Sequence, residues 1–133
     1  MDKAELYIGL EGEARTVVNE SNTAAAVGSG ILQVFGTPMM IALMEEAACD
    51  SVKPFLADGE GTVGISVDIT HEAATPVGME VTATARLVEI DRRRLLFEVE
   101  AFDEAGRIGG GTHERFIINN SKFQAGADAK RNP

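Results

Sequence analysis

The hydrophobic positions of the chain form one long helical pattern, within the stretch 34–56. Thr37 is a suitable N-cap residue and Pro38 fits the first helical position, so we expect the helix to begin there. At about 100° per residue, one face collects apolar and small side chains, with Ile41 and Val52 on its flank. The members of this face are Met40, Leu43, Met44, Ala47, Ala48, Ser51 and Phe55.

One acidic residue departs from this helical pattern. Glu46, Asp50 and Lys53 lie on the opposite, polar face, whereas Glu45 falls at the edge of the apolar stripe. A carboxylate at the border of a core either reaches solvent along its stem, pairs with an arginine, or takes part in chemistry. The pattern alone leaves these three interpretations open.

Alternating apolar and polar positions predict strands in ranges 13–18, 62–71, 79–90, 94–103 and 107–119. A short helical turn is expected at 23–27. Three successive glycines at 109–111 predict a bulge or a close backbone approach. In the second strand, four apolar residues share one side with His71, whose imidazole is therefore expected on the core-facing side. These residues are Val63, Ile65, Val67 and Ile69.

The order of a strand, a long helix and four further strands predicts an α+β protein, with one helix on an antiparallel sheet. Because the helix is apolar over most of its circumference, we expect the sheet to wrap around it, as in a hot-dog fold. The 133 residues fit one domain, 1–133, with a mobile tail at 124–133. Such a sheet leaves one edge poorly covered, which predicts a homodimer.

Composition narrows the classes of function. The net charge of −9, from 12 basic and 21 acidic residues, argues against nonspecific binding to nucleic acid. The apolar runs are too short to span a membrane, and the first residues do not resemble a secretion signal, so we expect a cytoplasmic protein. Cys49 is the single cysteine and is expected to be an inert buried thiol at the back of the helix. The spacing of the two histidines gives almost no signal for a metal site.

Three residues are candidates for chemistry on physical grounds: Thr37 at the helix start, Glu45 two turns later, and His71 at a strand end. Thr37 and Glu45 are about 12 Å apart along the helix axis, so a substrate or a histidine would have to bridge them. Each also has a structural interpretation, as a cap, an ion-pair partner and an interior histidine. His113, the other histidine, is expected to be structural, or to support a catalytic residue, rather than to be catalytic itself.

Four motifs follow one another along the chain: VGSG at 27–30, FGTP at 35–38 running into LME at 43–45, THEAATPVG at 70–78, and GTHER at 111–115. In these motifs and their spacing, the chain resembles the hot-dog acyl-CoA thioesterases, in particular the fluoroacetyl-CoA thioesterase group. The resemblance covers residues from about 13 to 123.

The resemblance implies catalytic roles for Thr37, Glu45 and His71. It implies that Gly64 lies near the thioester carbonyl and that Arg115 binds substrate, with the CoA phosphates as one possible contact. It implies no metal and no cofactor, since CoA is part of the substrate. Further basic residues are weaker candidates for the phosphates: Arg92, Arg93, Arg94 and Lys122.

The segment 27–33 departs from the fluoroacetyl-specialised member, because it lacks the aromatic residues that close over the substrate there. We therefore expect a thioesterase acting on a more general short- or medium-chain acyl-CoA. One alternative is a hot-dog enoyl-CoA hydratase, for which Asp68 would be the aspartate closest to His71, although it has the opposite strand parity. A second alternative is a non-catalytic acyl-CoA-binding protein.

Overall fold

The computed structural model describes residues 5–132, and the elements follow the predicted order. Residues 1–4 and 133 of the predicted domain lie outside this range. The strands are β1 (Glu11–Val17), β2 (Glu60–His71), β3 (Glu80–Asp91), β4 (Arg94–Asp103) and β5 (Gly106–Asn119). The helices are α1 (Ala24–Val27), α2 (Thr37–Val52) and α3 (Asn120–Asp128), with 3-10 turns η1 (Lys53–Phe55) and η2 (Ala129–Arg131).

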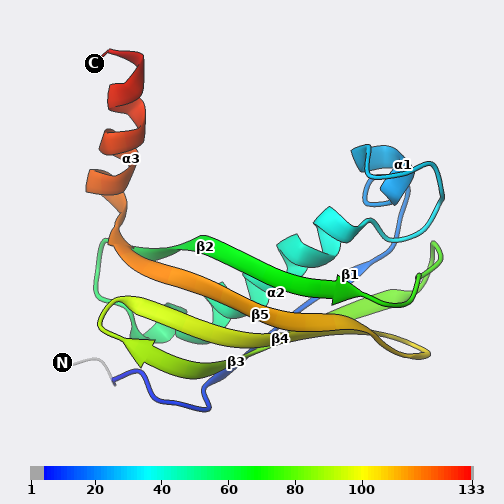
Figure 1. The fold of residues 1–133 in the computed structure, drawn as a ribbon, viewed down its shortest axis with the longest axis horizontal. Helices are drawn as coiled ribbons and strands as arrows, with labels where there is room; N and C mark the ends of the chain where they lie inside the picture. Colours follow the sequence, from blue (N-terminus) through cyan, green and yellow to red (C-terminus); the bar gives the residue numbers. More distant parts are fainter. Residues whose placement is uncertain (1–4, 133) are drawn as a thin grey trace.

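The five strands form one antiparallel sheet in the order β1-β3-β4-β5-β2, and α2 lies across one face of it (Figure 1). The long connections from β1 through α2 to β2 place these two strands at opposite edges. This arrangement of one long helix against a curled antiparallel sheet confirms the predicted α+β hot-dog fold.

The core lies between α2 and the inward faces of β3 and β4. The predicted apolar face of α2 is buried from Met40 to Ser51, and Val52 is buried with it, while Phe55 is half-buried in η1. Several core positions carry alanine, which lets the helix approach the sheet closely. At the crossing with β1, a Cβ on Gly12 would collide with the carbonyl oxygen of Ala47. The buried strand residues are Val81, Ala83, Ala85, Leu87, Leu95, Phe97, Val99 and Ala101.

A β-bulge interrupts β2 and corrects the predicted alternation. Gly64 pairs with Arg115 and Ser66 with Glu114, so Ile65 is an extra residue in the pairing with β5. Before the bulge, Thr62 and Gly64 face the helix and the side chain of Val63 points to the other face. After it, the order is inverted and His71 faces the helix side. The prediction was therefore wrong for Val63 and right for His71.

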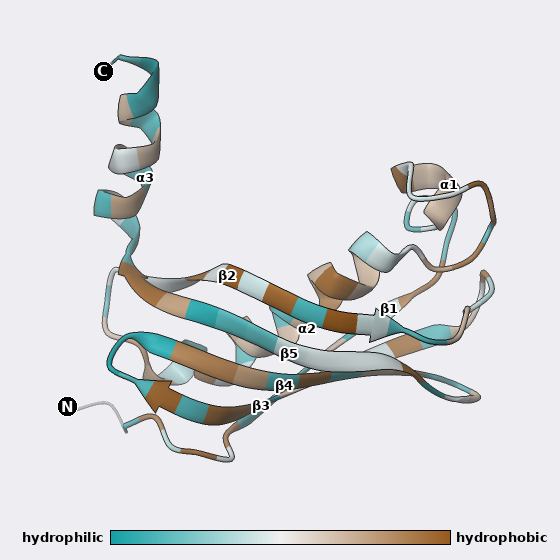
Figure 2. Ribbon diagram, viewed as in Figure 1, coloured by the Kyte–Doolittle hydropathy of each residue, from teal (hydrophilic) through white to brown (hydrophobic). Residues whose placement is uncertain are grey.

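The C-terminal residues form α3 and η2, which the strand pattern did not predict. Asn119 caps α3, its side chain accepting from the backbone N–H of Lys122. The helix has no buried residue, is mostly hydrophilic, and projects from the body beyond the β2 edge (Figure 2). The mobility expected for residues 124–133 stays a prediction.

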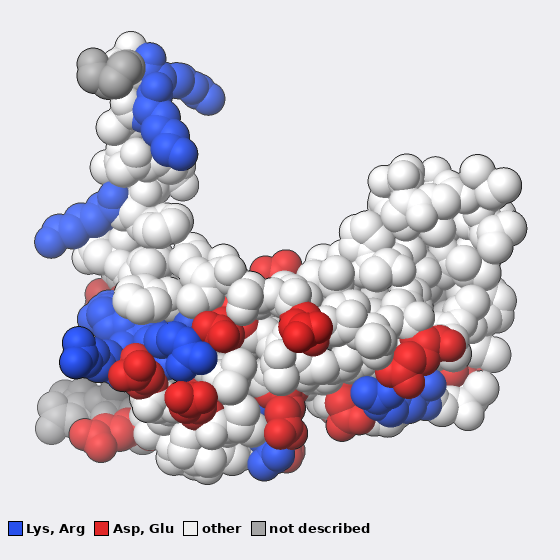
Figure 3. All heavy atoms as spheres, in the orientation of Figure 1, with Lys and Arg blue, Asp and Glu red and all other residues white. Residues whose placement is uncertain are grey.

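A second projection, the arm of residues 21–35 with the short helix α1, stands at the other end of β2 (Figure 1). No Asp, Glu, Lys or Arg occurs from Ser21 to Met44, and the arm shows no charged colour in Figure 3. Its side chains Ile31 and Leu32 are 89% and 63% exposed. Within residues 5–132, no helix is both long and apolar enough to cross a membrane.

Candidate active site

Thr37 and His71 form a direct pair at the start of α2. The Oγ1 atom of Thr37 lies 2.7 Å from Nδ1 of His71, at the end of β2. The N-cap residue is Gly36, in extended conformation, and no side chain caps the helix. The prediction that Thr37 is the N-cap was wrong, because its hydroxyl bonds to the imidazole and Thr37 is itself the first helical residue. The pair therefore sits at the positive end of the helix dipole.

The imidazole of His71 is half-buried at the end of β2. Burial lowers its pKa from the ordinary value, and a backbone hydrogen bond to Ala73 opposes this effect. The buried Nε2 atom has no hydrogen-bond partner among residues 5–132. A neutral imidazole with an unused ring nitrogen can take a proton from water or deliver one to a leaving group.

The Thr37–His71 pair lines a cavity of about 230 Å³. The arm supplies one wall, with Ala24 and Ser29, and Phe35 lies beside Thr37. The chain after β2 supplies the other wall, from Glu72 to Ala74. Apolar and small side chains thus share the lining with a few polar residues, including Glu72, which is the usual composition of a small-molecule site.

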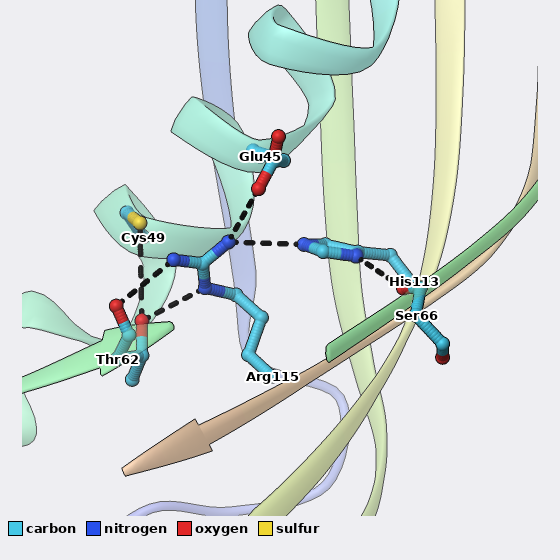
Figure 4. A network of polar contacts seen from close by, with 6 residues as sticks. All are labelled: Glu45, Cys49, Thr62, Ser66, His113 and Arg115. Atoms are coloured by element: carbon cyan, nitrogen blue, oxygen red, sulfur yellow. Dashed lines mark hydrogen bonds and ion pairs between the residues drawn. The ribbon is translucent and has the colours of Figure 1, made fainter. Parts of the chain in front are cut away.

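Glu45 lies in a separate polar cluster further along α2 (Figure 4). Its Oε2 atom is 3.2 Å from NH1 of Arg115, and its side chain is 40% exposed. Arg115 also donates to the hydroxyl and carbonyl oxygens of Thr62, at 2.8 and 3.0 Å, and lies 3.1 Å from Nε2 of His113. Glu45 is therefore held by an arginine through one oxygen, while much of its side chain stays accessible.

Arg115 is 5% exposed, and its guanidinium is engaged inside this cluster. It lies next to Glu45, which agrees with a place in the site. Its burial argues against contact with CoA phosphates at the surface, the contact considered from the sequence. The arrangement instead suits a residue that positions Glu45.

Gly64 packs against the Glu45 carboxylate. A Cβ at this position would lie 2.8 Å from Oε2 of Glu45, 3.2 Å from Cε1 of His113 and 3.4 Å from NH1 of Arg115. The glycine is therefore needed for close approach rather than for an unusual backbone angle. The structure places Gly64 at Glu45, where a substrate carbonyl would have access to the backbone.

The structure brings Thr37 and His71 together but leaves Glu45 apart from them. Eight residues of helix separate Thr37 from Glu45, about 12 Å along the axis, and the carboxylate leans toward Gly64 in the middle of β2. The sequence reasoning did not single out Thr62. It gave His113 a structural or supporting role, and the structure places His113 beside Arg115 in this cluster, because residues two apart in a strand share a face.

Cys49 does not lie at the back of the helix, as the sequence suggested. It follows Glu45 by one helical turn, is half-buried, and its Sγ lies 3.8 Å from Oγ1 of Thr62. This places the thiol beside the polar cluster. Among residues 5–132, no three side chains of the His, Cys, Asp or Glu type are grouped to hold a metal ion.

The remaining basic candidates lie at the opposite end of the sheet from His71. Arg92, Arg93 and Arg94 line a surface cavity of about 500 Å³ at the β3–β4 turn. Arg93 pairs with Glu60, and Arg94 pairs with Glu89 and Glu114. Figure 3 shows basic side chains gathered there and further ones on α3. These candidates are therefore far from the Thr37–His71 pair within one copy of the chain.

Comparison with known proteins gives a consistent family. A profile described as fluoroacetyl-CoA-specific thioesterase, FlK, matches residues 18–121. A fluoroacetyl-CoA thioesterase from Streptantibioticus cattleyicolor is 46% identical over 93 residues, which are 70% of this chain and 67% of that protein.

Solved structures of FlK extend the similarity to the whole fold. One has a TM-score of 0.91 at 35% identity, covering 98% of this chain and 100% of the other. A variant of FlK in complex with acetyl-CoA has a TM-score of 0.89 at 35% identity, covering 96% and 100%. With the family profile covering most of its length, the chain belongs to the fluoroacetyl-CoA-specific thioesterase family.

Proposed function

We propose that this protein is a homodimeric acyl-CoA thioesterase that hydrolyses a short- or medium-chain acyl-CoA to a carboxylate and free CoA. The observation that carries the proposal is the contact of 2.7 Å between Thr37 Oγ1 and His71 Nδ1 at a small cavity of mixed lining. Family membership makes thioester hydrolysis the reaction to expect. We also propose a cytoplasmic location, with which the single free cysteine agrees.

Each polar group of the site has a role in the proposed reaction. His71 takes a proton from the attacking water and later delivers it to the thiolate of CoA. Thr37 donates a hydrogen bond to the substrate at the positive end of α2. Glu45 either directs the water or attacks the carbonyl itself, and the amide of Gly64 stabilises the oxyanion. If Glu45 directs water, the C–O bond to water forms, the C–S bond breaks, and the acid and the thiol leave. If Glu45 attacks, the C–S bond breaks as a mixed anhydride forms, and water then cleaves the anhydride to the acid and the free Glu45 carboxylate.

The proposed homodimer rests on the two edges of the sheet, which differ sharply. The β1 edge is short and carries Glu11, Glu13 and Arg15, which discourage pairing with another strand. The β2 edge is 12 residues long and exposes Ile65 and Val67. Pairing of β2 with the β2 strand of a second copy would cover it.

Such pairing would also complete the site. Around a two-fold axis the two β2 strands run antiparallel, so full overlap puts Glu60 opposite the partner's His71. Gly64, beside Glu45, is seven residues from His71 of its own chain, about 23 Å of strand at roughly 3.3 Å per residue. Across the pair, the partner position that faces Gly64 is four residues from the partner's His71, which is about 13 Å along the strand. We therefore propose that Glu45 of one copy serves the Thr37–His71 pair of the other.

The kind of acyl group in the substrate is inferred from the residues of the arm. Segment 27–33 contains the aliphatic side chains Val27, Ile31 and Leu32 and no aromatic ring, and its Ser29 lines the cavity. A segment without aromatic rings at this place favours an unsubstituted acyl chain over a fluorinated one. The hydratase alternative finds no support, because Asp68 is exposed and, three residues from His71 in the same strand, lies on the opposite face of β2.

The proposal is tested by thiol release from a panel of acyl-CoAs, from acetyl and fluoroacetyl to decanoyl, with enoyl-CoA hydration measured in parallel. Glu45→Gln and His71→Ala are expected to lower kcat by about 10²–10⁴-fold, the range for a positioned acid–base group. Glu46→Gln, one residue along the helix and exposed, is the matched control. Near-normal turnover in both site variants would refute the assignment, and tight binding without turnover by the wild type would indicate a binding protein.

A further inference from the structure

One buried histidine has no role in the proposed reaction. His113 on β5 is 1% exposed, and its ring packs near Phe97 of β4, with ring centroids 6.4 Å apart. Both ring nitrogens are nevertheless in polar contact: Nδ1 lies 2.8 Å from the carbonyl oxygen of Ser66, and Nε2 lies 3.1 Å from NH1 of Arg115. A fully engaged imidazole beside Glu45 needs an explanation.

These two contacts define which ring nitrogen carries the proton. A guanidinium has only N–H donors, so Nε2 of His113 must accept from Arg115. A carbonyl oxygen only accepts, so Nδ1 must carry the hydrogen and donate to Ser66. The geometry therefore requires a neutral imidazole with its hydrogen on Nδ1.

The bulge in β2 supplies the acceptor for this hydrogen. The pairing of β2 with β5 shifts between Gly64 and Ser66, and a bulge frees backbone groups from the regular ladder. The carbonyl of Ser66 follows the shift directly and meets the imidazole. The same irregularity thus places Gly64 against Glu45 and fixes the ring of His113.

We propose that His113 is a positioning residue for Glu45. The NH1 group of Arg115 has two hydrogens, and its two partners are His113 Nε2 and Glu45 Oε2. The imidazole therefore orients the NH1 group that holds the carboxylate (Figure 4). The proposal rests on the proposed function, because the position of Glu45 matters only if Glu45 takes part in the reaction.

Protonation of His113 would break this arrangement. The groups that face the ring are Arg115 on β5, Glu45 on α2, the Ser66 carbonyl on β2 and Phe97 on β4. Burial lowers the pKa of His113, and the positive charge of Arg115 lowers it further, against the opposing effects of Ser66 and Glu45. A hydrogen on Nε2 would point at the N–H of Arg115, so the guanidinium would turn away and release Glu45.

Two substitutions at His113 separate its role as a hydrogen-bond acceptor from its ability to titrate. His113→Gln keeps an oxygen that accepts from Arg115 but cannot titrate, whereas His113→Leu fills the space without an acceptor. We expect His113→Leu to lower kcat by about 10- to 100-fold, as for a catalytic group displaced by about 1 Å, with KM little changed. His113→Gln is expected to keep most of the activity and to lose less of it at acid pH than the wild type. Glu114→Gln, the neighbouring residue on the other face, is the control.

Imidazole ¹⁵N NMR of the wild type gives a readout that needs no substrate. The expected spectrum shows His113 neutral and protonated on Nδ1 at pH 7; a charged ring or the other tautomer would overturn the proposal. Unchanged kcat in a folded His113→Leu variant would overturn it as well. If the wild type hydrolysed no acyl-CoA, the proposed function would fail while the NMR result still decided the state of His113. If His113→Leu did not fold, the acid-pH profile of His113→Gln would decide.

Discussion

The two halves of the site are built in opposite ways. The Thr37–His71 pair has one side-chain hydrogen bond and an imidazole nitrogen without a partner among the described residues, beside a cavity. The Glu45 half is a cluster in which Arg115 is held from several sides and buried. The contrast indicates a division of labour. In the proposed reaction, one half keeps a proton acceptor for the substrate, and the other fixes a charge in place before the substrate arrives.

Among substitutions in the fixed half that keep the Glu45 side chain itself, Gly64→Ala is expected to have the largest effect. The added methyl carbon would lie 2.8 Å from Oε2 of Glu45, so the carboxylate must move. A displacement of this kind costs about 10²-fold in rate, and we expect a loss of that order in kcat, measured by thiol release.

Gly61→Ala in the same strand is the control for this substitution. Its new methyl group would meet only the side chain of Asn120, which can turn away. If Gly64→Ala kept as high a kcat as Gly61→Ala and the wild type, the Glu45 carboxylate would not need to stay where the structure places it.

A smaller effect is expected on stability, through the pH dependence of the free energy of unfolding. The pKa values of His71 and His113 are both lowered, by burial first, so the native state binds fewer protons than the unfolded chain just below the ordinary value of 6.5. The free energy of unfolding should therefore fall as pH decreases from about 6.5 toward the native pKa values. His113→Gln should make this fall shallower, as measured by urea unfolding at several pH values. An unchanged pH dependence would show that His113 does not contribute.

The smallest effect is expected at Cys49. Its thiol contacts Thr62 at 3.8 Å and is separated from Glu45 by Thr62 and Arg115. A weak contact of this kind is worth under about 0.5 kcal/mol, so Cys49→Ala should change kcat by less than about threefold. A large loss of kcat in the Cys49→Ala variant would mean that the rigidity of the cluster extends to the helix surface.

The fold could be predicted because its signals are local. The apolar face from Met40 to Val52 and the alternation in β3 and β4 are periodic over many residues, and periodicity reports which side is buried. The bulge at Ile65 was missed because Val63, Ile65 and Val67 keep a period of two through it, although Val63 and Val67 face opposite sides of the sheet.

Contacts between distant segments were harder to predict. Thr37 is a residue type that is common at N-caps. Its hydroxyl has another partner only because the fold brings His71 of β2 next to it. Arg115 looks like a surface cation in sequence, and its burial depends on Thr62 and Glu45, which lie 53 and 70 residues away. The resemblance to a family supplied the catalytic assignment that these patterns alone left open.

The most direct test of the proposed site is complementation between two defective copies. Differently tagged His71→Ala and Glu45→Gln chains are co-expressed, and the mixed dimer is purified through both tags. If Glu45 of one copy serves His71 of the other, one of the two sites is intact, and about half of the wild-type kcat per dimer should return under two-fold symmetry. A mixed dimer as inactive as both parents would contradict the account, because each site would then lie within a single copy.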